Sequence, residues 1–203
     1  MPQEPRTAHS VVEASLYLTV TPCAACRHGA LVVSAPVAGD APEVVGFTTT
    51  CRNCGVAETF WFRLPVALSP ADLRADPVSS NAPISTVAEP SRLIDPVQWV
   101  TLAQLELESV AATPSAGEQR WARIRAAQCL DEALKFYTPD NELPPEDALL
   151  AESSRAALRE FPQRFARPRL AAQRAALPAD GLVNRVVNDP PGAPRRKPWW
   201  RIW

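Results

Sequence analysis

Four cysteines are the residues of this chain with the clearest chemistry. They form two C-x-x-C pairs, Cys23-Ala-Ala-Cys26 and Cys51-Arg-Asn-Cys54, separated by the 24 residues from 27 to 50. A C-x-x-C on a tight turn presents two thiolates to one ion, and Zn²⁺ takes four such ligands at tetrahedral corners. The two pairs therefore predict a structural Zn²⁺ site with Cys23, Cys26, Cys51 and Cys54 as ligands. Gly55 fits the close backbone turn that the second pair needs.

Other uses of these thiols are weaker interpretations. A thioredoxin-like redox C-x-x-C belongs in a βαβ context, which the surrounding sequence does not predict. A catalytic Zn²⁺ keeps an open position beside a general base, and His28 is a candidate for that base or for a ligand, although a surface histidine is the simpler interpretation. Cys129 lies in an alanine-rich helical segment, where a single cysteine is usually a small core residue.

The segments around the two cysteine pairs are predicted to be strands. Residues 11–20 are rich in Val, Leu and Tyr and predict a strand that leads into Cys23. Residues 30–33 and 44–50 flank a turn-like stretch at 36–42 and predict a hairpin that delivers Cys51. Residues 59–64 predict a further strand after Cys54. The Cys pairs are thus expected on two turns between short strands.

This arrangement resembles the zinc ribbon family over residues 16–64, from the strand before Pro22-Cys23 to the strand after Cys54-Gly55. The resemblance implies an antiparallel three-stranded fold with the four cysteines as ligands. Zinc ribbons serve transcription, translation and assembly proteins, so the resemblance does not fix an activity. Ribbons that contact nucleic acid usually carry a basic surface, whereas residues 1–64 hold four arginines against five acidic residues.

The rest of the chain divides into a linker, a helical domain and a tail. Prolines punctuate residues 65–91, which predict a linker with one helical turn near Asp72. Asp95-Pro96 and Ser115 to Glu118 are helix-start signals, and they predict helices over 96–111 and 116–137. Further helices are expected from about 145 to 161 and over 167–177, packed antiparallel. The predicted fold is α+β: a zinc ribbon (1–64), a linker (65–91), a helical domain (92–177) and a flexible Pro-rich tail (178–203).

Charge and motifs exclude several functions. The net charge is −1, and residues 92–177 carry eleven Lys/Arg and twelve Asp/Glu, a balance typical of a solvated surface that would include Arg125 and Glu132. No phosphate-binding or hydrolase motif occurs, so we expect no enzyme activity. Residues 1–10 lack the features of a signal peptide, and no apolar run is long enough to cross a membrane. These features predict a soluble, cytoplasmic protein.

The end of the chain is the second informative feature, because three of the six tryptophans fall in the last five residues. An indole buries a large apolar area when it docks, and cations surround these three. We interpret the segment as a docking peptide for a partner; folding back onto its own domain and contact with an anionic membrane surface are the alternatives. The predicted partner-binding residues are Arg195, Arg196, Lys197, Trp199, Trp200, Arg201 and Trp203.

The sequence therefore predicts a non-enzymatic zinc-binding adaptor or assembly protein that docks on a protein partner. A nucleic-acid-associated zinc ribbon protein, related to transcription or translation, is the alternative, and a zinc-dependent enzyme is a third interpretation.

Overall fold

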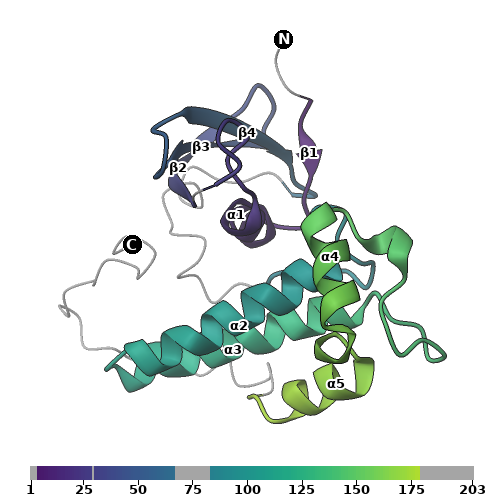
Figure 1. The fold of residues 1–203 in the computed structure, drawn as a ribbon. Coiled ribbons are helices and arrows are strands. Elements are labelled where there is room, and N and C mark those ends of the chain that lie inside the picture. The colour runs from purple at the N-terminus through teal and green to yellow at the C-terminus, as the bar shows by residue number, and fades with distance from the viewer. Residues whose placement is uncertain (1–3, 29, 67–82, 179–203) are drawn as a thin grey trace.

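The structure is a computed structural model that describes residues 4–28, 30–66 and 83–178. It is an α+β fold in which helix α1 (Val11–Val20) lies between a four-stranded sheet and a pair of long helices (Figure 1). The strands are β1 (Arg6–Thr7), β2 (Leu31–Ala38), β3 (Val44–Cys51) and β4 (Ala57–Arg63), in the order β1-β4-β3-β2. Strands β2, β3 and β4 form the predicted antiparallel meander, and β1 adds a short parallel edge next to β4.

The strand predicted over residues 11–20 is wrong, because this segment is helix α1. The Ser10 side chain caps the helix by accepting a hydrogen bond from the Glu13 backbone N–H at 3.0 Å, and the Glu13 carboxylate accepts from the His9 N–H. Helix α1 is buried on both sides by the sheet and the helices, so it carries apolar residues nearly all round and lacks a one-sided pattern. The Ser10-x-x-Glu13 spacing is the sequence signal that indicates the helix start.

The inner face of the sheet is built from alternating aromatic and apolar residues. Phe47 and Phe62 are fully buried and meet edge to face, with ring centroids 5.8 Å apart. Phe60 and Val45 lie on the same face, since residues two apart along a strand point to one side. This face packs toward α1. The packing fixes the position of β3, the strand that ends at Cys51.

The helical half contains α2 (Pro96–Ala112), α3 (Ala116–Leu134), α4 (Glu152–Glu160) and α5 (Arg167–Ala175). The predicted starts of α2 and α3 are confirmed: Asp95 and Gln98 form a reciprocal capping box, and Ser115 caps α3. The third predicted helix begins too early, because residues 146–148 form a separate 3₁₀ turn and α4 starts only at Glu152. Helices α2 and α3 pack side by side as a hairpin (Figure 1).

The buried core extends across the predicted linker. One cluster joins Phe47 and Leu18 to Ile94, Trp99 and Leu130. Residues 83–91 are packed into it through Ile84, which is 1% exposed. The helical turn predicted near Asp72 lies outside the described residues.

Three charged residues expected on the surface are buried: Arg125, Glu132 and Glu106, of which Glu106 is 8% exposed. Arg125 is 7% exposed and donates to the Gln128 side chain at 2.9 Å. Glu132 is 4% exposed and accepts two hydrogen bonds of 2.8 Å from Lys135, which also donates to the Val87 carbonyl. Lys135 links Glu132 to the segment at Val87, and the charge of Arg125 acts on Glu106 of α2. A helical pattern does not reveal such contacts between segments, so the balanced charge count suggested a solvated surface.

Candidate metal centre

Three elements bring the four cysteines together. Cys23 and Cys26 lie on the turn after α1, which ends at Val20 and whose last turn is closed by the Thr21 hydroxyl donating to the Tyr17 carbonyl at 2.7 Å. Cys51 is the last residue of β3, and Cys54 lies on the turn that leads into β4. The first pair is therefore carried by a helix, where the sequence predicts a strand.

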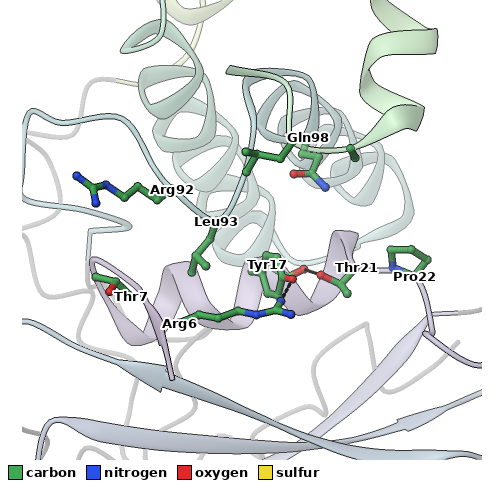
Figure 2. Close-up of a pocket in the computed structure, with 10 residues that line it drawn as sticks. Arg6, Thr7, Tyr17, Thr21, Pro22, Arg92, Leu93 and Gln98 are labelled. Carbon is green, nitrogen blue, oxygen red and sulfur yellow. Dashed lines mark hydrogen bonds between the residues drawn. The ribbon is translucent and has the colours of Figure 1, made fainter. Parts of the chain in front are cut away.

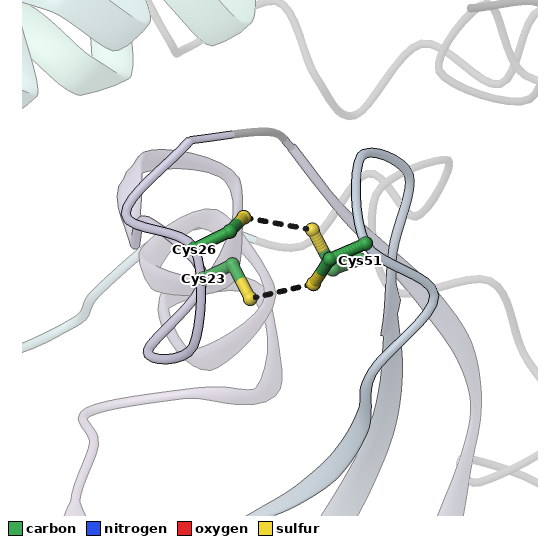
Figure 3. Close-up of side chains that lie close together, drawn as sticks. Cys23, Cys26 and Cys51 are labelled. Carbon is green, nitrogen blue, oxygen red and sulfur yellow. Dashed lines mark hydrogen bonds between the residues drawn. The ribbon is translucent and has the colours of Figure 1, made fainter.

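The four sulfur atoms lie within 4.8 Å of one another. The Sγ–Sγ distances are 3.6 Å between Cys23 and Cys54 and 3.7 Å between Cys26 and Cys51 (Figure 3). A tetrahedral Zn²⁺ with Zn–S bonds of about 2.3 Å requires S–S edges of about 3.8 Å. These separations are far above the roughly 2.05 Å of a disulfide, and all four thiols are free. The quartet thus has the donor type, number and spacing of a metal site.

The two cysteine turns share one backbone geometry. In each, the residue after the second cysteine has a positive φ: 59° at Arg27 and 74° at Gly55. The N–H of that residue donates to the carbonyl of the first cysteine at 2.9 Å, from Arg27 to Cys23 and from Gly55 to Cys51. Glycine at position 55 is the sequence signal for this turn. Arg27 occupies the equivalent position without that signal.

Hydrogen bonds to the sulfur atoms favour the thiolate form at two of the four positions. The Asn53 side chain and then the His28 backbone lower the pKa of Cys26 to about 6. The Cys26 backbone lowers the pKa of Cys23 below its usual value. Cys54 differs: the Val56 backbone lowers its pKa, but burial and the three neighbouring thiols outweigh this and raise it to about 12. Four thiolates this close repel one another unless a cation binds them.

The cluster itself contains sulfur ligands and no histidine or carboxylate among the described residues. The His28 side chain is exposed, and its backbone carbonyl lies 2.7 Å from the Cys26 Sγ. Cys129 is fully buried in the core of α3, where burial raises the pKa of its thiol well above the usual value. The prediction that Cys129 is a core residue is therefore confirmed.

The predicted partner-binding residues of the tail, from Arg195 to Trp203, lie outside the described residues. Their role remains a prediction. Within the part of the chain that the structure does describe, no helix is both long enough and apolar enough to span a membrane.

Comparisons with family models, with curated proteins and with solved structures give no significant match to this chain.

Proposed function

We propose that Cys23, Cys26, Cys51 and Cys54 bind one structural Zn²⁺ and that the protein is a non-enzymatic adaptor built around it. The observation that carries this proposal is the quartet of sulfurs within 4.8 Å, supplied by two turns of the same geometry. Four thiolates fill a tetrahedral shell and leave no position for substrate, which is the arrangement of structural rather than catalytic zinc.

The position of the site supports a folding role. Cys23 lies three residues after the end of α1, and Cys51 ends β3, so the ion would tie the central helix to the sheet. Cys23 and Cys51 are 3% and 1% exposed, which places two ligands against the core. Metal binding stabilises a fold when the site does not exist in the unfolded chain. Loss of the ion should therefore loosen the N-terminal half first.

The metal is tested by elemental analysis of the purified chain together with Co²⁺ substitution. We expect one Zn²⁺ per chain and, with Co²⁺, the intense charge-transfer and visible bands of tetrahedral thiolate coordination. The conservative variant Cys51→Ser is expected to reduce the metal content, and Cys129→Ser, which changes a cysteine outside the quartet, is expected to retain it. A metal content that survives Cys51→Ser would contradict the proposed ligand set.

The adaptor role is tested by co-purification from the native cell. The intact chain and a chain ending at residue 194 are compared, because the predicted docking peptide begins at Arg195. We expect the intact chain to retain a defined partner that the shortened chain loses. Equal recovery by both chains would remove the tail from the proposal. A catalytic turnover abolished by Cys51→Ser but not by Cys129→Ser would overturn the non-enzymatic assignment.

A further inference from the structure

A groove runs along α1, between that helix, β1 and the segments at residues 92–98 and 150–151. It has a volume of about 500 Å³. Figure 2 shows Thr7, Tyr17 and Thr21 spread along one side, with Leu93 and Gln98 across from them. Helix α1 has ten residues, which corresponds to roughly 15 Å at about 1.5 Å per residue. An extended peptide of four or five residues spans that length at about 3.3 Å per residue.

The described lining of the groove contains two arginines, Arg6 and Arg92, and no acidic residue. Neither arginine forms an ion pair with a described carboxylate. The Arg6 guanidinium is held in place because it donates to the Tyr17 hydroxyl and lies over two rings, 5.2 Å from the centroid of Tyr17 and 5.7 Å from that of Phe60. That one bond uses a single N–H of a group with five donors.

Two acids next to the lining in sequence, Asp95 and Glu152, are already engaged, whereas the exposed Glu4 and Glu89 lie two and three residues from Arg6 and Arg92 along the chain. Both oxygens of the buried Asp95 accept backbone N–H groups, one from Gln98 at 2.8 Å and the other from Leu150 and Ala151 at 3.2 and 3.3 Å. Glu152 pairs with arginines farther along its own helix. No described carboxylate forms an ion pair with Arg6 or Arg92, so an acidic ligand would not have to displace one from either guanidinium group.

The remaining surface of the groove combines hydrogen-bond donors with apolar area. Gln98 uses its side-chain oxygen to accept from the Asp95 N–H, which leaves its amide nitrogen as a donor. Leu93 and Leu150 add apolar surface, and Leu150 is 52% exposed. The guanidinium groups and the amide donor of the lining suit carboxylates of a ligand, and the exposed leucine suits an aliphatic side chain of the same extended ligand.

We propose that this groove is a docking site for an acidic peptide segment of a partner protein, bound extended along α1 through Arg6 and Arg92. The proposal deepens the adaptor function and rests on it. Charge complementarity decides the occupant: the cationic end of this chain, with Arg195, Arg196 and Lys197, has the same sign as the groove and does not suit it. The groove and the tail are thus separate docking elements.

The test measures fluorescence anisotropy of a labelled pentapeptide, Asp-Glu-Leu-Asp-Glu, titrated with the full zinc-loaded chain. A matched peptide in which Asn and Gln replace the acids is the ligand control. Arg92→Glu is the test variant, because Arg92 is exposed and makes no bond with a described residue that its loss would break. Arg120→Glu, an exposed arginine on α3, makes the same change of charge outside the groove.

We expect the acidic peptide to bind and to lose about tenfold or more in affinity in Arg92→Glu, with Arg120→Glu within about twofold of the original chain. Equal losses of affinity in both variants would show that the peptide is attracted by net charge alone and would overturn the proposed groove site. Absence of binding, or equal binding of the neutral peptide, would overturn it as well.

The adaptor function is judged separately, by co-purification of a partner with the intact chain. A partner that is retained by the intact chain while the acidic peptide fails to bind would refute the groove and leave the adaptor function standing. A failure to co-purify any partner, with the acidic peptide still binding selectively, would refute the adaptor function and leave the groove as a peptide site.

Discussion

The two positive-φ residues of the cysteine turns are predicted to respond in opposite ways to exchange of their side chains. An L-residue in the left-handed region costs about 1–2 kcal/mol relative to its relaxed backbone. A Cβ added at Gly55 meets no atom within 4 Å, so Gly55→Ala adds backbone strain without a clash. Arg27 already carries that strain at φ 59°. Gly55→Ala should therefore destabilise the second turn, and Arg27→Gly should relax the first.

The expected magnitudes follow from this backbone term. Gly55→Ala should cost about 1–2 kcal/mol in backbone strain and regain roughly 0.5–1 kcal/mol from the smaller freedom of alanine in the unfolded chain, which leaves a net cost of about 0.5–1 kcal/mol. Arg27→Gly regains a similar amount of strain energy but loses roughly 0.5–1 kcal/mol to the greater freedom of glycine in the unfolded chain, which leaves a net gain of about 0.5–1 kcal/mol. One kcal/mol corresponds to about a fivefold change in an equilibrium constant. Zn²⁺ affinity should thus fall about two- to fivefold in the first variant and rise about two- to fivefold in the second.

The assay is competition for Zn²⁺ with a chromophoric chelator, supported by urea unfolding of the loaded chain. Arg27→Ala is the matched control, because it removes the guanidinium but keeps a Cβ in the left-handed region; its affinity should stay near that of the original chain. If Arg27→Gly and Arg27→Ala change the affinity equally, the side chain of Arg27 matters and the backbone argument is wrong. An unchanged affinity in Gly55→Ala would refute it as well.

Three further predictions concern the core. Burial raises the pKa of Glu106 from 4.5 to about 7 despite the charge of Arg125. The stability that the protonated Glu106 carboxyl contributes is present below pH 4.5 and is lost as pH rises toward 7. The free energy of unfolding of Glu106→Gln, measured with urea across pH, should therefore exceed that of the original chain by about 3 kcal/mol at pH 8 and match it near pH 4.5. Asp95→Ala leaves three backbone N–H donors unpaired and should lower the free energy of unfolding by about 3–5 kcal/mol. Asp95→Asn keeps an acceptor oxygen and should retain part of that stability. Equal losses of stability in the two variants, in thermal or urea unfolding, would contradict the capping role. Gly46→Ala places a Cβ 2.6 Å from the Trp61 ring and should cost about 1–3 kcal/mol, and a cost that persists in a Trp61→Ala background would refute that contact.

The local signals in the sequence predicted those parts of the structure that depend on neighbours in the chain. The C-x-x-C pairs identified all four cysteines of the cluster, because the spacing of the thiols within each turn is set by a few residues. Asp95 and Ser115 marked the starts of α2 and α3, because a helix cap is a contact across three residues. The alternation of Phe60 and Phe62 placed β4 for the same reason.

The features that the sequence did not predict depend on contacts between distant segments. Residues 11–20 favour a strand by composition, yet they form α1, because a helix there packs against the sheet and the helical pair at once. Glu132 lies on α3, and its partner Lys135 also donates to the Val87 carbonyl, so the burial of Glu132 depends on a segment distant in the sequence. The groove also exists only in the folded chain, since it joins β1, α1, residues 92–93 and the turn before α4.

The sequence by itself determined the chemistry of the candidate metal centre: four thiols in two pairs, and a glycine where one turn requires a positive φ. Tertiary structure decided how those ligands are carried. The first pair follows a buried helix and the second joins two strands, so the sulfurs meet only when α1 packs on the sheet. Spacing within a pair is a local property of the backbone, whereas the distance between the pairs is set by the packing of the whole N-terminal half.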